Sequence, residues 1–179
     1  MKIVVFDLET QNLFDDVGGR GNIGALKVSV AVTWSSVQNK FSIYWEKDVP
    51  VLVAELKSAD RVVGFNIKGF DYEVLRPYVP QERLQFLPSL DIMADLFRTL
   101  SFRVSLEAVA SATLGEGKSA SGLQAVEWWR AGELDKLVEY CQMDVDVTRR
   151  VYDFGCANGY VHYFTRLGSK QKVQVNWKC

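Results

Sequence analysis

The sequence predicts an α/β layered domain, because strand patterns fall early in the chain, helical patterns follow them, and nothing separates the two parts. The chain has 179 residues, a length that fits one domain better than two. No internal repeat, low-complexity segment or linker interrupts it. We therefore expect a single domain over residues 1–179.

The first half of the chain alternates strands with short helices. Residues 2–8 (KIVVFDL) are almost all apolar, which predicts a strand covered on both faces in the middle of a sheet. Residues 11–24 are polar and rich in glycine, as in a loop. Further strands are expected at residues 28–34, 41–45 and 61–66, and helices at residues 49–58 and 70–78, the last stopped near Pro80.

The second half is mainly helical. Apolar residues recur at helical spacing over residues 92–100, 105–114, 123–131 and 133–157. The tail, residues 160–177, is expected to be extended and irregular.

Bulk properties narrow the function classes. The net charge of −1 argues against tight, passive binding of long nucleic acid, which usually needs many basic side chains. No apolar run approaches the ~20 residues that cross a bilayer, and no cleavable signal peptide is visible. The three cysteines contain no CxxC pair and form no disulfide framework, which favours a reducing, cytoplasmic location.

Three groups of acidic residues stand out, and the first lies on the N-terminal strand. Asp7 and Glu9 are two residues apart, so both side chains lie on one face of the strand, at its C-terminal end. A metal ion would offset the cost of two carboxylates on a buried strand. The alternative is that they only end the strand at the surface.

The other two groups lie at a turn and on the long helix. After the strand at residues 61–66, Asn66 enters a turn and Asp71 falls in the first turn of the next helix, where an acid is favourable without any function. On the long helix, Tyr140 and Asp144 are stacked neighbours at the edge of the apolar stripe, so Asp144 needs a partner. Asp146 lies on the opposite, solvated face.

The segments FDLET, VGFNIKGFD and YCQMD, in this order, resemble the three motifs of the DEDD exonuclease superfamily. The stretch at residues 105–129 also resembles a bacterial group of predicted 3′–5′ exonucleases, some of which occur with helicase-like proteins. The resemblance implies a ribonuclease-H-like fold, with a mixed central sheet flanked by helices. Glu139 occupies the position of the histidine that defines one branch, and Tyr140 that of the tyrosine that defines the other. The chain therefore resembles the tyrosine branch, and His162 lies too far along the chain to replace either residue.

The resemblance implies a 3′–5′ exonuclease that hydrolyses phosphodiester bonds of DNA or RNA to nucleoside 5′-monophosphates, with two divalent cations, Mg²⁺ or Mn²⁺. Asp7 would bridge both cations, Glu9 and Asp144 would complete the first, and Asp71 would hold the second. By the same resemblance, Tyr140 would orient the attacking water.

The resemblance also assigns residues that contact or support the substrate. Leu8 and Thr10 would lie beside the terminal nucleotide, and Asn66 would brace the second motif. The expected partner is the 3′ end of a nucleic acid, most simply single-stranded, and a helicase or another nucleic-acid-processing protein could deliver it.

Two alternatives stay open: a catalytically silent nucleic-acid-binding or helicase-partner scaffold of the same fold, and an unrelated α/β enzyme. Several other signals have simpler readings. Asp91 could add to the acidic site but more simply caps a helix. Basic residues such as Lys68 and Arg103 could form a substrate-facing patch but are more simply ordinary surface. GEGKS at residues 115–119 is expected to be an interhelical loop in which Lys118 could lie near a phosphate.

Overall fold

The structure, a computed structural model, describes residues 1–115 and 122–178 and contains a five-stranded mixed sheet. The strand order is β3-β2-β1-β4-β5. β1 pairs antiparallel with β2 and parallel with β4, so the sheet is mixed and β1 lies at its centre. The strands are β1 (Ile3–Thr10), β2 (Val28–Ser35), β3 (Lys40–Trp45), β4 (Arg61–Gly64) and β5 (Ser89–Asp91). The predicted α/β fold class, with helices flanking a mixed sheet, is confirmed.

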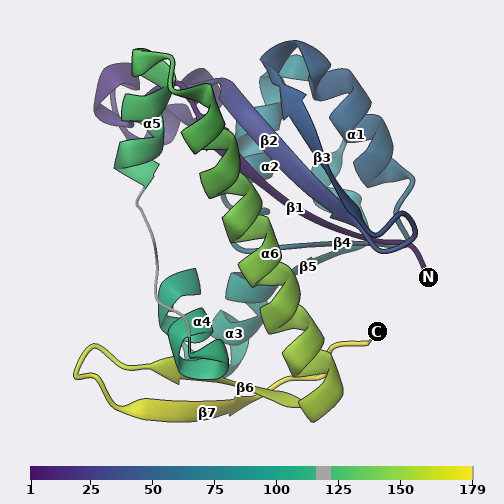
Figure 1. Cartoon of the computed structure of the whole chain (residues 1–179), viewed down its shortest axis with the longest axis vertical. Coiled ribbons are helices and arrows are strands. Elements are labelled where there is room, and N and C mark those ends of the chain that lie inside the picture. The colour runs from purple at the N-terminus through teal and green to yellow at the C-terminus, as the bar shows by residue number, and fades with distance from the viewer. Residues whose placement is uncertain (116–121, 179) are drawn as a thin grey trace.

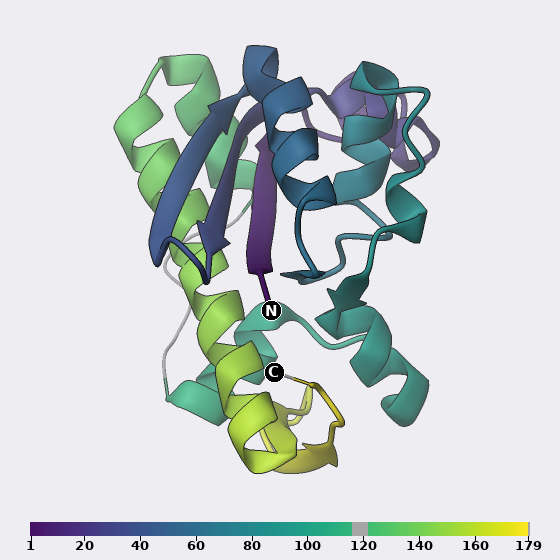
Figure 2. The ribbon, with the colours of Figure 1, turned by 90° about the vertical axis from the view of Figure 1, so that its right-hand side faces the viewer.

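Helices cover both faces of this sheet (Figures 1 and 2). On one face lie α1 (Val49–Lys57) and the short α2 (Asp71–Leu75). The long α6 (Leu134–Asn158) crosses the other face, where it contacts β1 and β2. The remaining helices are α3 (Ile92–Leu100), α4 (Leu106–Leu114) and α5 (Gly122–Ala131). The predicted helices therefore exist, with ends that shift by a few residues.

The alternation of side chains along β1 decides which residues reach which face. Phe6 and Leu8 belong to the core cluster packed by α1 and α2, whereas Val5 belongs to the cluster packed by α6. Because side chains alternate along a strand, Asp7 and Glu9 lie on the same side as Val5. The apolar residues at the start of β1 thus place the strand in the core, and the alternation of its side chains directs Asp7 and Glu9 toward α6.

The pairing of β1 with β4 is short and creates an opening. β4 pairs with β1 only over Ile3–Val5, and β4 itself ends at Gly64. β1 continues to Thr10 beside β2 alone. The chain that leaves β4 therefore turns away next to the acidic end of β1, as polar segments commonly do at the carboxyl ends of strands in open α/β sheets.

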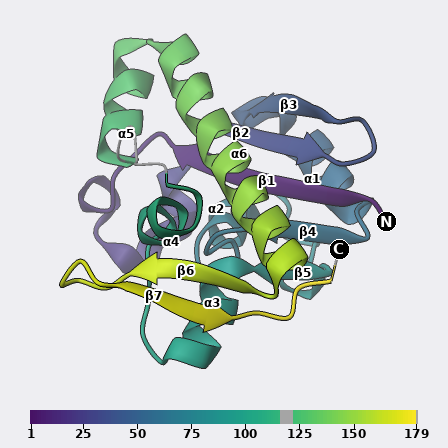
Figure 3. The ribbon, with the colours of Figure 1, turned by 60° about the horizontal axis from the view of Figure 1, so that its bottom comes forward.

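The structure differs from the sequence prediction in three places. The tail is not irregular: β6 (Tyr160–Phe164) and β7 (Lys170–Gln174) form an antiparallel hairpin that lies beside α4 and the end of α6 (Figure 3). β5 was missed altogether. The loop at residues 11–24 contains short 3₁₀ segments, at residues 15–17 and 20–26.

Two remaining expectations concern membranes and cysteines. Among the described residues, none of the helices is both long and apolar enough to cross a membrane. Cys141 is a buried free thiol. The reducing, cytoplasmic location stays a prediction.

Candidate active site

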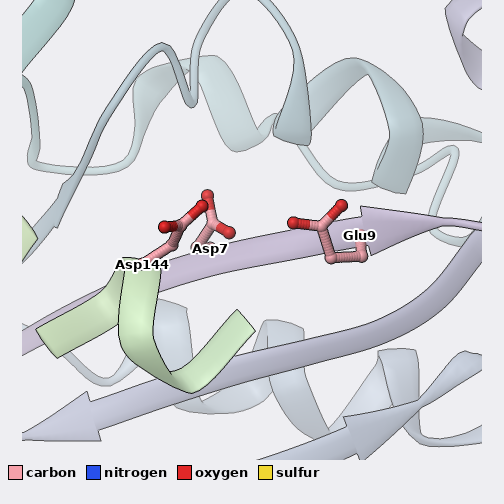
Figure 4. A group of neighbouring side chains, drawn as sticks. All are labelled: Asp7, Glu9 and Asp144. Carbon is pink, nitrogen blue, oxygen red and sulfur yellow. The ribbon is translucent and has the colours of Figure 1, made fainter. Parts of the chain in front are cut away.

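Three carboxylates meet where α6 crosses the end of β1. One oxygen from each of Asp7, Glu9 and Asp144 can be chosen so that all three lie within 4.8 Å of one another. Figure 4 shows Asp7 and Glu9 rising from β1 toward Asp144 on α6. The structure thus brings together acids that are more than 130 positions apart in the chain, as the sequence reasoning expected.

Asp7 carries the strongest electrostatic perturbation. Its burial, followed by the charges of Asp71, Asp144 and Glu9, raises its pKa well above the ordinary range. The thiol of Cys141 donates weak hydrogen bonds to the Asp7 backbone oxygen at 3.6 Å and to its Oδ2 at 3.9 Å. Burial and the same acids raise the pKa of the Cys141 thiol. Cys141 therefore stays a neutral donor, a role that the apolar helix pattern did not reveal.

Asp71 lies beside this trio but does not belong to it. It begins α2, is 2% exposed, and its Oδ1 accepts a hydrogen bond of 3.2 Å from the backbone nitrogen of Leu8. Burial raises its pKa to about 8, although the N–H groups of Asp71 and Leu8 act in the opposite direction. The favourable charge of an acid in the first turn of a helix does not explain why Asp71 is buried and close enough to Asp7 to raise its pKa.

Tyr140 lies one helical turn before Asp144 and is 5% exposed. Its ring packs edge-on against Trp128 of α5, with centroids 5.9 Å apart. Its hydroxyl hydrogen-bonds to Asp144; burial and the negative charges of Asp144, Glu9 and Asp7 raise its pKa. The phenol therefore stays protonated and faces the carboxylates. Trp128 also packs against the core.

A buried aspartate organises the turn that carries the second motif. Asp91 accepts hydrogen bonds from the backbone nitrogens of Asn66 at 2.9 Å, Lys68 at 2.9 Å and Ala94 at 3.1 Å. The bond from Ala94 confirms the predicted helix cap. The other two hold the turn in which Asn66 adopts a left-handed φ of 65°. This second role depends on the β4–β5 pairing, which the sequence did not reveal.

A pocket of about 360 Å³ opens over the acids and is called here the acidic pocket. Its polar wall contains Asp7, Glu9, Asp71 and Asp144, together with Asn66. Its other walls come from β1, the segment after β1, the turn after β4, and α5, and include Leu8, Thr10, Phe14, Leu26, Phe65, Phe70, Leu123 and Val126. The residues expected beside a terminal nucleotide, Leu8 and Thr10, therefore line the same pocket as the acids.

The donor set suits hard divalent cations. Carboxylate oxygens are the ligands that Mg²⁺ and Mn²⁺ prefer. Among the described residues, the group that could hold a metal consists of aspartate and glutamate and contains none of the cysteine or histidine ligands typical of zinc. Buried carboxylates that raise one another's pKa also indicate a place that a cation would stabilise. The residues present fit a divalent cation held by Asp7, Glu9 and Asp144.

Two other residues considered in the sequence, Asp146 and His162, lie outside the acidic pocket. Asp146 forms ion pairs with Arg149 at 2.7 Å and Arg150 at 3.7 Å, away from the acidic pocket. His162 lies on β6, where its ring contacts Tyr160. Lys118 lies outside the described residues.

The fold and the site define an α/β domain whose central sheet presents a cluster of carboxylates able to hold a metal. Residues 4–155 match the model of a family described as belonging to the RNase H superfamily. This match covers most of the chain, so the chain belongs to the RNase H superfamily. No curated protein matches it.

Among solved structures, the fold is similar to that of the family B DNA polymerase from the hyperthermophilic archaeon Pyrobaculum calidifontis. The TM-score is 0.65 and the identity is 18%, over 86% of this chain and 24% of the polymerase chain. This chain therefore spans about a quarter of the length of that polymerase. At this identity the likeness supports the fold.

Proposed function

We propose that this chain is a metal-dependent nuclease, and specifically a 3′–5′ exonuclease that releases nucleoside 5′-monophosphates from DNA or RNA. The observation that carries the proposal is the meeting of Asp7, Glu9 and Asp144 within 4.8 Å, in a pocket that Asp71 also lines. Membership of the RNase H superfamily supports it. Tyr140, bonded to Asp144, supports the tyrosine branch of the DEDD exonucleases.

In this proposal Asp7 contributes to both cation sites, Glu9 and Asp144 complete one, and Asp71 serves the other. Two bound Mg²⁺ or Mn²⁺ ions would supply an acidified water and neutralise charge on the phosphate. The backbone of Leu8 fixes Asp71 through its N–H, so one strand positions ligands for both sites.

The neighbouring residues position the reactants. The hydroxyl of Tyr140 is a neutral donor beside Asp144, which suits orientation of the attacking water rather than its deprotonation. Leu8 and Thr10 would contact the terminal nucleotide inside the acidic pocket. Asn66 would brace the second motif through its turn. A cytoplasmic location and a helicase partner stay predictions.

The test is a gel assay on 5′-labelled single-stranded DNA and RNA, with Mg²⁺, with Mn²⁺ and with EDTA. Asp144→Asn and Asp146→Asn form a matched pair, because both change one acid on α6 and only Asp144 lies in the acidic pocket. Loss of a group that merely supports a metal ligand typically costs about 10–100-fold, so Asp144→Asn should cost at least about 100-fold. Asp146→Asn should stay within about 2-fold of wild type.

The products decide between the alternatives. A metal-dependent ladder that shortens from the 3′ end, and is lost in Asp144→Asn, supports the exonuclease. Binding of nucleic acid without products under any metal would instead favour the catalytically silent scaffold of the same fold.

A further inference from the structure

Two more pockets continue from the acidic pocket along one side of the molecule. The first, of about 350 Å³, shares Asp7, Phe65, Asn66 and Asp144 with the acidic pocket. The second, of about 360 Å³, shares Asn66, Met93 and Arg103 with the first. Together they form a groove that begins at the acids and is more open than the acidic pocket. We call it the side groove and define it by Phe65, Asn66, Lys68, Met93, Phe97 and Arg103.

Arg103 is held over the middle of this groove. It lies in the short segment between α3 and α4, where Ser101 ends α3 in a left-handed conformation and the buried Val104 anchors the chain. Its Nη2 donates a hydrogen bond of 3.3 Å to Oδ1 of Asn66. Gly69 leaves room for this contact, since a Cβ there would lie 2.7 Å from the same oxygen. The guanidinium is therefore directed into the groove.

The two basic side chains of the groove, Arg103 and Lys68, are not neutralised by ion pairs with other described residues. Lys68 lines the far part of the groove, and its backbone is fixed by Asp91. Phe97 lines the same part and is 46% exposed. Two cations and an exposed ring are the features that bind the phosphates and bases of a single strand.

We propose that the side groove binds the strand on the 5′ side of the cleaved bond. Arg103 contacts the first phosphate beyond the cleaved one, and Lys68 contacts the next, while a base packs on Phe97. The inference rests on the proposed function, because it takes the acids as the place of cleavage. The acidic pocket, walled by apolar side chains, holds the single terminal nucleotide, and the more open groove leaves a path for the rest of the strand. The substrate class is thus a single-stranded end of at least four nucleotides, because the cleaved linkage and the two beyond it join four nucleotides.

The binding test uses a fluorescent ten-nucleotide single strand and the full chain in EDTA, so that no cleavage occurs. Arg103→Ala should weaken binding about 10-fold and lower the slope of log K against log salt by about 0.7, the loss of one phosphate contact. Arg103→Lys, which keeps the charge, should stay within about 3-fold of wild type. Arg103→Gln keeps a donor for Asn66 but should behave like Arg103→Ala. Arg83→Ala is the matched control, because Arg83 is exposed and lines none of the three pockets.

A modified strand locates the contact. A neutral methylphosphonate at the second linkage from the 3′ end should weaken wild-type binding as much as Arg103→Ala does. It should cause no further loss in Arg103→Ala, and the same change at the sixth linkage should have little effect in either protein. This pattern distinguishes a phosphate contact from a structural role of Arg103, which a neutral linkage would not mimic.

The outcomes separate this inference from the proposed nuclease. Equal losses in Arg103→Ala and Arg83→Ala, no loss in either, or no measurable binding by the wild-type chain would overturn the groove. If the chain cleaves but Arg103→Ala binds normally, the groove is wrong and the nuclease stands. If Arg103→Ala binds weakly as expected but no metal supports cleavage, the groove stands as a single-strand binding site, and the nuclease and the position of the strand relative to a cleaved bond are wrong.

Discussion

Replacing Asp7 by Asn should make the metal-free protein more stable while it destroys activity. The three carboxylates have oxygens within 4.8 Å of one another. At an effective dielectric constant of ~20, two unit charges at this distance repel by about 3 kcal/mol. Asp7→Asn removes two such pairs, but the raised pKa of Asp7 means that part of this charge is already protonated. We expect a net gain of about 2–4 kcal/mol at pH 8 in EDTA, or about 4–16 °C in Tm.

The pH dependence gives the prediction its sign. The pKa values of both Asp7 and Asp71 are raised in the folded state, that of Asp71 from 3.8 to about 8. The folded protein therefore binds more protons than the unfolded chain between these values, and its free energy of unfolding falls as the pH rises through this window. The advantage of Asp7→Asn should accordingly be large at pH 8 and should shrink to below about 1 kcal/mol near pH 4, where Asp7 and Asp71 of the folded wild type are protonated.

Thermal unfolding followed by circular dichroism at pH 8, pH 6 and pH 4 measures this effect. Asp146→Asn is the control, since it removes a charge that is ion-paired with Arg149, and it should lose at most about 1 kcal/mol. Mn²⁺ should raise the Tm of the wild type and raise that of Asp7→Asn much less, because a ligand that binds only the folded state stabilises it. An Asp7→Asn protein that is no more stable than wild type at pH 8 in EDTA would refute the reasoning.

Three further substitutions probe the site and its support. Tyr140→Phe keeps the packing against α5 but removes the hydroxyl bonded to Asp144, so turnover in the gel assay should fall about 10–100-fold, with Tm almost unchanged. Asp91→Ala removes three hydrogen bonds to a buried carboxylate and should cost about 3–5 kcal/mol in urea unfolding. Gly155→Ala places a Cβ 2.3 Å from the Trp177 ring and should destabilise α6 by about 1–3 kcal/mol; a raised urea midpoint would contradict this.

Those elements that carry a strong periodic pattern could be predicted from the sequence. The apolar run at residues 2–8 predicted a central strand, and period-two alternation then placed Asp7 and Glu9 on one face. On α6 the apolar stripe alone separated Asp144, which lines the acidic pocket, from Asp146, which is 32% exposed and ion-paired with Arg149. Both inferences needed only the geometry of a single element, which explains why they held.

The features that were missed depend on pairings between distant segments. β5 has three residues and leads directly into α3, so it is too short to show alternation. β6 and β7 are stable as strands because the inner side chains Val161, Tyr163 and Val173 are buried against the rest of the fold. The sequence could not decide whether Arg103 belongs to a substrate-facing patch or to ordinary surface, because its contact with Asn66 joins residues 37 positions apart.

The three clustered carboxylates come from distant parts of the chain, and this has a consequence for biosynthesis. Asp7 and Glu9 are synthesised together on β1, whereas Asp144 follows Glu9 by 135 residues, on α6. A nascent chain that has not yet reached α6 can pair β1 with β2, but it lacks one wall of the site and one of its acids. Chains are made and begin to fold from the N-terminus at about 5–20 residues per second. The cell would therefore meet this proposed hydrolytic centre only after the long helix has been synthesised, and abortive or truncated products that end before it should be harmless to nucleic acids.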